Sequence, residues 1–598
     1  MMIRIPLITS LIHYFKVVYS YTGRKLYILL LLFLLGGLSE SIGISMLLPI
    51  LDVDKAVSEQ SQYAKTIYVF LESIGINVSL ISLLTLLLIA FISKGAFVYF
   101  QKTFTSYITY NLIKNIRFDF CDKYKKMKYS YYTNTSIGYL NNIITTEITR
   151  GIFAINRYIT LIGGLIFTLV FVAFAVAINF KVTLLVLFLS LLLFALMRGL
   201  SRLSRKISML ISETNAQLQS LLIQFIYNYK YIKATDSFTH IFKRLFGIIN
   251  RNYTYQFKSN VLTYIPSSLI EPISVFVMSG LVLYYVEFQG ESIAEIFVLV
   301  IFFYKAFGYI FRFQSDWQKF NAGLGGLEVM IKASRILNNN VENVGYRQIN
   351  AFNKAIELKN VNFSYGPRQV FFDVNLAIQK NKSIGIVGES GAGKTTMFDI
   401  ITGLLTPQSG KISIDGIDYS ELEFSSLRNI IGYVTQEPVI FNDTISNNIS
   451  FWECDSQEDI CRKRIKDAAI LANCDRFINE SEMGYETIIG DKGVRISGGQ
   501  RQRIAIAREV FKDPEIMIFD EATSALDTES EMLIQKSINS LKGTCTVVII
   551  AHRLSTIKNC DYIYVLNKGR VVEEGSFTQL CDNRNSSLFK MIQAQKLL

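Results

Sequence analysis

The chain has 598 residues, which is too long for one hydrophobic core, so two or more domains are expected. Its residues are 50% hydrophobic and its mean hydropathy is +0.31, values that argue against a wholly water-soluble protein. The net charge of +12 would suit a nucleic-acid partner, but the basic residues gather in a few segments that indicate another role, so no nucleic-acid partner is expected.

Residues 1–24 begin the chain with a mixture of apolar and basic residues that stops short of a membrane span. No small-residue cleavage site follows this segment, which therefore differs from a signal peptide. We expect an elbow helix that lies along the membrane surface.

Residues 25–320 are expected to form a helical membrane domain. The apolar residues form runs of about 20 before residue 320 and none after it, and this is the length that a helix needs to cross the bilayer. The six predicted spans are residues 26–50, 80–101, 158–178, 182–200, 262–286 and 293–315.

The charges between the spans predict the orientation of the domain. Residues 101–157 hold nine Lys and Arg against three Asp and Glu, and residues 198–258 hold ten against two. Residues 51–79 instead hold two Lys against four acidic residues. Because short basic loops stay in the cytosol, both basic segments are expected on the cytosolic side.

Both basic segments are too long for simple turns. Their patterns predict spans that extend into the cytosol, with a short lateral helix at each tip, near residues 129–136 and 227–233. Residues 321–354 are then expected to form a helical linker that becomes more polar along its length.

Residues 355–598 have a different pattern. Short β-branched runs, such as residues 383–387 and 546–550, alternate with helical stretches. This alternation predicts an α/β domain with a largely parallel sheet.

A phosphate loop follows the first of these predicted strands, and a helix is expected to begin near Lys394. Its glycines allow backbone N–H groups to close around phosphate oxygens, while Lys394 reaches the β- and γ-phosphates and the Thr395 hydroxyl binds Mg²⁺. The residues of this segment expected to contact ATP are Gly388, Glu389, Ser390, Gly391, Ala392, Gly393, Lys394, Thr395 and Thr396.

Two carboxylates end the apolar strand predicted at residues 516–519. A buried strand presents polar groups only at its ends, so Asp520 and Glu521 are expected at the edge of the sheet. Asp520 is the candidate Mg²⁺ ligand, and Glu521 is the candidate residue that polarises the attacking water.

An SGGQ segment, Ser497 to Gln500, lies between the phosphate loop and this acidic pair. Ser497 is a natural N-cap for the helix predicted at residues 502–510. The ordered set, together with the membrane half, resembles the ATP-binding cassette (ABC) superfamily in its exporter branch. Ile496 stands where that family usually has Leu, a change that preserves hydrophobicity.

The resemblance implies roles for further residues. Gln436 would be the Q-loop residue that contacts Mg²⁺ and water, and His552 would contact the γ-phosphate, so both join Glu521 in the catalytic set. The remaining ATP contacts implied by the resemblance are Tyr365 on the adenine, Ser497, Gly498, Gly499 and Gln500 of the SGGQ segment, and Asp527 of the D-loop.

The resemblance also implies a dimer. In the family, the phosphate loop of one subunit and the SGGQ segment of the other enclose ATP, so one chain cannot complete a site. Because Lys394, Ser497, Glu521 and His552 all match the consensus, a homodimer is favoured over an unequal heterodimer.

Three ionisable residues near the middle of predicted spans are the candidates: Glu40, Glu271 and Lys305. Charged side chains at this depth are costly and are therefore functional candidates, here for a hydrated cavity that accepts a charged headgroup. The structural alternative is an ion pair between Glu271 and Lys305, with Glu40 as a hydrogen-bonded helix contact.

The predicted function is an ATP-hydrolysing exporter or flippase that moves an amphipathic lipid across the bacterial cytoplasmic membrane. Glu40, Pro49 and Glu271 resemble positions of bacterial flippases for lipid-linked oligosaccharides, although those often carry Arg and Pro where this chain has Lys305. The alternatives are a multidrug or lipid A-type exporter and, in another class, a non-transporting ATP-gated channel or regulator.

All seven cysteines lie in predicted cytosolic segments. A reducing compartment disfavours disulfides, and no cysteine spacing suggests zinc ligands. Free thiols are therefore expected at all seven positions.

Overall fold

The computed structural model describes residues 7–52, 62–178, 180, 183–184, 188, 198–283, 293–342, 345–522, 526–551 and 554–596. The chain divides into two compact units. The first comprises residues 1–127 and 131–341, and the second comprises residues 128–130 and 342–598.

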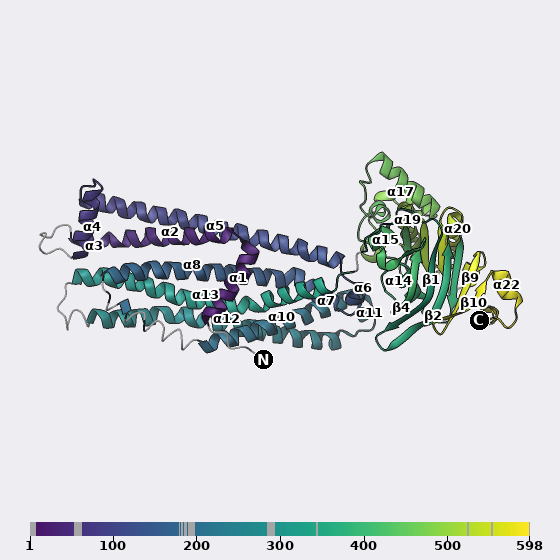
Figure 1. Cartoon of the computed structure of the whole chain (residues 1–598), viewed down its shortest axis with the longest axis horizontal. Coiled ribbons are helices and arrows are strands. Elements are labelled where there is room, and N and C mark those ends of the chain that lie inside the picture. Colours follow the sequence, from purple (N-terminus) through teal and green to yellow (C-terminus); the bar gives the residue numbers. More distant parts are fainter. Residues whose placement is uncertain are drawn as a thin grey trace. The chain divides into compact units, whose positions relative to one another are not determined.

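The described part of the first unit is helical (Figure 1). Its longer helices are α1 (Leu7–Thr22), α2 (Lys25–Ser45), α4 (Gln62–Ser73), α5 (Leu80–Lys125), α8 (Ile148–Ile178), α10 (Arg198–Tyr227), α12 (Phe238–Leu283) and α13 (Ile293–Asn339). Its shorter helices are α3 (Leu47–Asp52), α7 (Ile137–Asn142), the π-helix η1 (Ile143–Glu147) and α11 (Tyr229–Ala234). A further short helix, α6 (Tyr129–Thr133), has its first two residues in the second unit and the rest in the first.

Four helices among the described residues are long and apolar enough to cross a membrane: Lys25–Leu51, Leu80–Lys125, Ile137–Ala177 and Phe238–Gly280. They contain predicted spans one and two, all but the last residue of span three, and most of span five. The predicted fourth span, residues 182–200, lies mostly outside the described residues. The predicted sixth span is helical, as the first part of α13.

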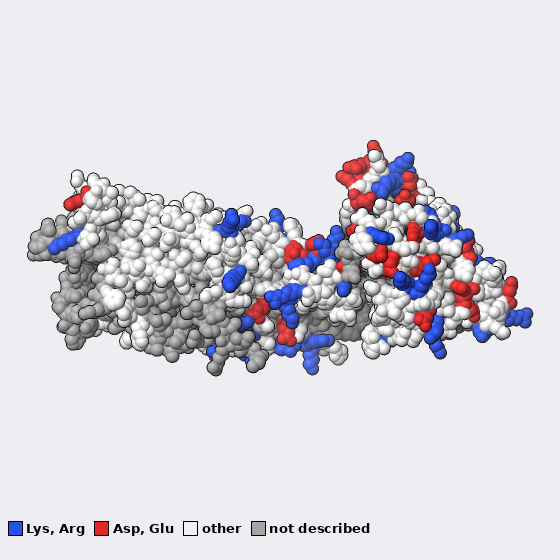
Figure 2. All heavy atoms as spheres, in the orientation of Figure 1, with Lys and Arg blue, Asp and Glu red and all other residues white. Residues whose placement is uncertain are grey.

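The helices α5 and α12 have 46 residues each, which corresponds to roughly 70 Å at 1.5 Å per residue. This is about twice the thickness of the hydrocarbon core, so both helices extend well beyond it. Short helices, α6 and α11, occupy the two tips, as the sequence predicted. On the visible face of the first unit, Lys and Arg gather toward these tips, and a long stretch of the helices is almost uncharged (Figure 2).

A buried polar network ties η1, α8, α10 and α13 together. The Glu147 carboxylate is fully buried and accepts hydrogen bonds from Arg150 Nη1 at 3.0 Å and Ser212 Oγ at 2.8 Å. One turn along α10, the Ser208 hydroxyl accepts the backbone N–H of Gly325 at 2.9 Å. Because the charge has both an ionic partner and hydrogen bonds, its burial is compensated.

The second unit contains two sheets. The first has four strands in the order β2-β1-β4-β5, and the second has six in the order β10-β9-β3-β8-β7-β6. The strands are β1 (Ala355–Tyr365), β2 (Arg368–Gln379), β3 (Ser383–Gly388), β4 (Ser409–Ile414), β5 (Ile417–Asp418), β6 (Ile431–Val434), β7 (Ile516–Asp520), β8 (Thr546–Ile550), β9 (Tyr562–Asn567) and β10 (Arg570–Gly575).

Helices cover the six-stranded sheet and extend beside it. The α-helices of this unit are α14 (Lys394–Ile401), α15 (Phe424–Asn429), α16 (Ile445–Ser450), α17 (Asp459–Leu471), α18 (Asp475–Asn479), α19 (Gly498–Phe511), α20 (Thr528–Leu541), α21 (Leu554–Ile557), α22 (Phe577–Asp582) and α23 (Ser587–Lys596). The short 3-10 turns are Tyr419–Glu421, Gly484–Glu486 and Asp491–Gly493.

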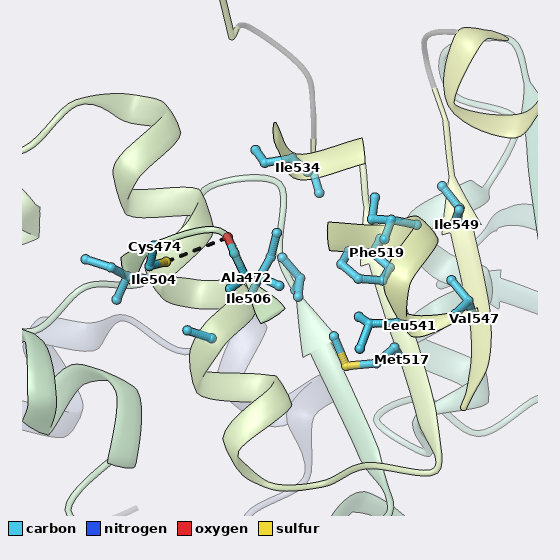
Figure 3. Close-up of a cluster of buried hydrophobic side chains, with 14 of the residues drawn as sticks. Ala472, Cys474, Ile504, Ile506, Met517, Phe519, Ile534, Leu541, Val547 and Ile549 are labelled. Carbon is cyan, nitrogen blue, oxygen red and sulfur yellow. Dashed lines mark hydrogen bonds between the residues drawn. The ribbon is translucent and has the colours of Figure 1, made fainter. Parts of the chain in front are cut away.

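Pairing in the six-stranded sheet is parallel except between β9 and β10, which agrees with the predicted α/β domain. Every residue of β7 and β8 is buried, as expected for strands covered on both faces. Met517 and Phe519 of β7 pack with Val547 and Ile549 of β8 and with Ile534 of α20 (Figure 3). This core fixes the strand that ends in the two candidate carboxylates.

The expectation of seven free thiols is wrong for two cysteines. Cys454 and Cys461 form a disulfide with a Cα–Cα distance of 6.1 Å. The turn before α17 brings the loop cysteine back to the first turn of that helix, so two residues seven positions apart become neighbours. The other five, Cys121, Cys474, Cys545, Cys560 and Cys581, are not part of a disulfide.

Candidate functional site

The phosphate loop connects the end of β3 to the start of α14. Gly391 and Gly393 have φ angles of +82° and +101°, which side chains of L-residues rarely adopt. A Cβ on Gly393 would also lie 2.6 Å from the ring of Phe371. The loop can therefore turn its backbone N–H groups toward one point only with glycine at these positions.

Lys394 begins α14 and lies inside the loop. Its ammonium donates hydrogen bonds to the carbonyl oxygens of Gly388 at 2.9 Å and Glu389 at 3.1 Å. Burial lowers the pKa of Lys394, and the nearby Glu521 and Asp520 carboxylates oppose that shift. A phosphate group in the loop would offer this ammonium stronger, charge-assisted hydrogen bonds.

The strand register places the carboxylates opposite the phosphate loop. Ile550 at the end of β8 pairs with Ile386 of β3 on one side and with Asp520 of β7 on the other. The carboxyl ends of the three strands therefore lie at the same edge of the sheet, where α/β folds bind ligands. His552 follows β8 in the sequence and lies outside the described residues.

Asp520 is buried, with 5% of its surface exposed, and accepts a hydrogen bond from the Tyr433 hydroxyl at 3.3 Å. Burial raises the pKa of Asp520, and the adjacent Glu521 carboxylate raises it further. A cation at this position would reverse both effects, because it would compensate the buried negative charge.

Glu521 has a left-handed backbone, with φ at +47°, which is uncommon for a residue with a side chain. Its N–H donates to the Ile550 carbonyl at 3.1 Å, which holds this conformation against β8. Its carboxylate accepts a hydrogen bond of 2.7 Å from Gln436 Nε2. Strained residues of this kind cluster at functional sites, and here the strain directs the carboxylate toward the Q-loop residue.

A cavity of about 500 Å³ lies between these groups. Its lining residues are Tyr365, Arg368, Val370, Ser390, Gly391, Gly393, Lys394, Thr395, Thr396 and Glu521. Tyr365 is 48% exposed and stands perpendicular to the ring of Phe363, so about half of its surface remains available to a planar ligand. Arg368 and Val370 are lining residues that sequence reasoning missed, because the family motifs do not include them.

The SGGQ segment begins α19 with a capping box. Ser497 Oγ accepts the N–H of Gln500 at 3.2 Å, and the Gln500 side chain accepts the N–H of Ser497 at 2.9 Å. The predicted N-cap is thus confirmed, although the helix begins at Gly498 rather than at residue 502. Gly499 is required because a Cβ there would lie 2.2 Å from Ser530 Oγ on α20.

Within the described part of the chain, none of the SGGQ residues lines the 500 Å³ cavity. Asp527 also lies outside its lining and instead caps α20, where it accepts the N–H of Ser530 at 3.0 Å. That hydrogen bond lowers the pKa of Asp527. One chain therefore brings the phosphate loop, Tyr365 and Glu521 to the cavity and leaves the SGGQ segment elsewhere.

The expected Mg²⁺ ligands offer oxygen atoms of the kind that this ion prefers. These are the Thr395 hydroxyl, the Asp520 carboxylate and the amide oxygen of Gln436, whose nitrogen is already engaged by Glu521. In the described residues, no group of three or more His, Cys, Asp or Glu side chains could hold a metal. This donor set fits an ion that shares its shell with phosphate and water.

A charged cluster lies within the predicted spans of the first unit. The Glu40 carboxylate of α2 is fully buried and accepts Lys94 Nζ of α5 at 2.8 Å and Lys305 Nζ of α13 at 3.1 Å. Tyr309, one turn beyond Lys305, donates its hydroxyl to the same carboxylate at 2.9 Å and stacks on Phe167 of α8. One carboxylate thus faces two ammonium groups, which leaves one positive charge in excess.

The cluster differs from the pairing considered from the sequence. Lys305 pairs with Glu40 rather than with Glu271, which is exposed and makes no ion pair among the described residues. Lys94 was missed, although its position in the middle of predicted span two meets the criterion that selected Glu40. The pairing could not be predicted because the rotation of each helix about its axis depends on packing.

Comparison with known proteins identifies the family. The family model described as ABC transporter transmembrane region matches residues 26–309, and that described as ABC transporter matches residues 371–524. The heterocyst differentiation ATP-binding protein HepA of Nostoc sp. is 31% identical over 546 residues, or 85% of this chain and 83% of that protein. The chain belongs to the ABC transporter family.

Other relatives match over shorter segments. The ATP-dependent lipid A-core flippase of Desulfotalea psychrophila is 46% identical over 229 residues, which are 38% of this chain and 39% of the flippase. The match to ABC transporter B family member 21 of Arabidopsis thaliana covers 40% of this chain and 18% of that protein.

A solved structure of a bacterial Atm1-family ABC exporter with ATP bound shares the fold. Its TM-score is 0.78 at 22% identity, covering 96% of this chain and 99% of that one. The sequence of this ABC transporter thus combines a transmembrane region with an ATP-binding domain of the kind that couples ATP hydrolysis to transport.

Asp399 on α14 gives the ATP-binding domain a pH-dependent stability. Burial and the neighbouring Asp520 carboxylate raise the pKa of Asp399 to about 6. The pKa of Asp399 in the folded state exceeds its unfolded value of about 4, so the free energy of unfolding decreases as pH rises from about 4 to about 6. Above pH 6 the lower stability remains constant. Asp399→Asn should stabilise the full-length protein at pH 7.5 by on the order of 1 kcal/mol after allowance for solvent screening, and by less at pH 5.

Thermal unfolding of both proteins at the two pH values measures this difference. Asp467→Asn, an exposed carboxylate on α17, is the matched control and should change neither value. An equal gain from Asp399→Asn at both pH values would contradict the assignment.

Proposed function

We propose that two copies of this half-transporter form a homodimer that moves an amphipathic lipid across the bacterial cytoplasmic membrane. The nucleotide site supports the dimer, since its cavity in one chain includes the phosphate loop and excludes the SGGQ segment. A second copy would supply Ser497, Gly498, Gly499 and Gln500, whose capped helix start is suited to an anion.

The residues of the cavity would divide the work of hydrolysis. Lys394 and the loop N–H groups would bind the phosphates, and Tyr365 would stack on the adenine. Thr395, Asp520 and Gln436 would hold Mg²⁺, which neutralises charge on the phosphates when bound. Glu521 would accept a hydrogen bond from the attacking water and orient it, and we assign His552 to the γ-phosphate.

Gln436 would connect hydrolysis to movement. It donates to Glu521 at 2.7 Å, and its loop also contacts the SGGQ helix, because Gln502 Nε2 donates to the Thr435 carbonyl at 3.2 Å. A ligand that drew Gln436 toward Mg²⁺ would therefore shift both the catalytic carboxylate and α19. The two short tip helices, α6 and α11, are the elements we assign to coupling.

The charged cluster in the membrane domain is the observation that carries the substrate class. Lys94 and Lys305 retain 24% and 38% exposure while sharing the buried Glu40. An excess positive charge inside a bilayer is costly unless an anion approaches it. We assign Glu40, Lys305 and, on its position in span five, Glu271 to the substrate pathway, and a lipid with an anionic headgroup to the cavity.

The lipid class also agrees with the names of bacterial relatives, two of which are ATP-dependent lipid A-core flippases. Among such lipids, a lipid-linked oligosaccharide is our specific candidate, since its phosphates would meet Lys94 and Lys305 while its polar chain would need a hydrated path. The same bacterial relatives support our assignment to the bacterial cytoplasmic membrane, with the ATP-binding domain in the cytosol.

Glu521→Gln should lower ATP hydrolysis by roughly 10²-fold or more, because it removes the group that orients water, while ATP binding is retained. Steady-state phosphate release and nucleotide binding, measured in nanodiscs, separate the two effects. Glu574→Gln, an exposed carboxylate on β10, is the control and should leave both unchanged. Retained turnover in Glu521→Gln would count against this residue as the base.

Lys305→Gln should lower the rate of headgroup translocation by roughly ten- to a hundredfold, because a charge-assisted contact of about 1.5–3 kcal/mol is lost. The variant keeps Glu40 paired with Lys94, so no buried charge is left without a partner. The measurement is the rate at which each protein translocates two fluorescent lipids in proteoliposomes, one that bears a phosphate and one that is zwitterionic. Glu271→Gln is measured in the same way as Lys305→Gln.

Lys332→Gln, an exposed lysine on the same helix, is the matched control for this experiment. If Lys305→Gln and Glu271→Gln translocate the phosphate-bearing lipid at the rate of the unmodified protein, the lipid assignment is wrong. Stimulation of ATP hydrolysis by hydrophobic drugs and not by glycolipids would favour a multidrug exporter instead.

A further inference from the structure

A second cavity, of about 520 Å³, lies in the cytosolic part of the first unit between α7, α10 and α12. The residues that matter here are Ser136 before α7, Gln217, Ser220 and Gln224 on α10, and Arg244 and Arg251 on α12. All of them belong to the first unit, so this cavity is separate from the ATP cavity. Neither the family motifs nor the charged membrane cluster accounts for it.

The wall formed by α12 is strongly basic. Arg244 and Arg251 are seven residues apart, so they lie on the same face of the helix at a spacing of roughly 10 Å. Arg251 Nε donates to the Gly247 carbonyl at 3.3 Å. This hydrogen bond leaves the two terminal nitrogens of Arg251 available to a ligand. Among the described residues, neither guanidinium forms an ion pair, and none of the cavity's lining residues is acidic.

The opposite wall offers hydrogen-bond donors. Ser220 Oγ accepts from Ser136 Oγ at 3.1 Å and from Gln224 Nε2 at 3.3 Å, so its own O–H is left to donate. Gln217 Nε2 donates to Glu213, which anchors this amide one turn away. On this wall α7 and α10 pack closely, since a Cβ on Gly138 of α7 would lie 2.2 Å from the Cα of Ser220 on α10.

Two unpaired guanidinium groups that face hydroxyl and amide donors match the oxygen-rich surface of a phosphate group. A neutral ligand would leave both charges uncompensated. We propose that this cavity binds a phosphate-bearing anion from the cytosol.

The position of the cavity distinguishes two sources of such an anion. The predicted fifth span begins at residue 262, which places Arg251 roughly 16 Å beyond the membrane boundary along α12. A soluble phosphorylated compound can diffuse to a site at this distance from the membrane, whereas the phosphate of a lipid stays near the membrane interface. An anion bound here would connect α7, which follows the first coupling tip, to α10 and α12, which flank the second.

The test measures binding of labelled inorganic pyrophosphate to full-length protein in phosphatidylcholine nanodiscs without nucleotide. All proteins carry Lys394→Ala, so that the phosphate loop of the ATP site contributes little. We expect Arg244→Gln/Arg251→Gln to weaken binding at least about tenfold. Lys243→Gln, an exposed neighbour outside the cavity lining, removes a like charge and should have a small effect.

A separate measurement checks that the protein remains folded. With Lys394 intact, Arg244→Gln/Arg251→Gln should retain basal ATP hydrolysis, because neither arginine lies in the ATP cavity. Pyrophosphate binding that survives in the double variant, or that falls equally in Lys243→Gln, overturns the proposal.

A second arm repeats the measurement in nanodiscs that contain phosphatidic acid. A loss of pyrophosphate affinity that requires Arg244 and Arg251 would identify the lipid phosphate as the occupant. Unchanged affinity would identify a soluble anion as the occupant, which is the result that the distance of the cavity from the membrane favours. Because the readout is ligand binding away from the ATP site, its failure leaves the proposed transport function unaffected.

Discussion

The shared register of β3, β8 and β7 is the constraint on which the ATP site depends. Ile550 pairs with strands on both sides, so the phosphate loop after β3 and Asp520 at the end of β7 reach the same edge of the sheet. A slip of one residue in β7 would turn its terminal carboxylate to the other face of the sheet, away from the position that it now has beside the end of β8. The Glu521 backbone and its contact with Gln436 then follow from where β7 ends.

Much of this site could be predicted from the sequence, because the motifs encode local geometry. Glycines at Gly391 and Gly393 signal positive φ, and Ser497 with Gln500 signals a capping box, whatever the rest of the fold does. The α/β class and the helical membrane half followed from periodicity and apolar run length. The start of α19 was predicted four residues late, since glycines normally argue against a helix and here the requirement for close packing on Ser530 prevails.

Contacts between distant helices could not be predicted in this way. The Glu40, Lys94 and Lys305 cluster joins α2, α5 and α13, and its composition depends on how each helix is rotated against its neighbours. The same holds for the arginine-lined cavity and for the Cys454–Cys461 disulfide, which arises from a turn that brings a loop residue beside the first turn of α17. Both basic sites place positive charge along the membrane unit, and this distribution is compatible with an anionic cargo or effector.

The central claim is that each ATP is held by two chains. Its most direct test co-expresses two differently tagged full-length variants, Lys394→Ala and Ser497→Ala, and purifies the mixed dimer through both tags. In the mixed dimer, one composite site has both residues intact and the other has neither. The account predicts that this dimer hydrolyses ATP well above either parent homodimer. A mixed dimer as inactive as both parents would contradict it, because that is the result for a site contained within one chain.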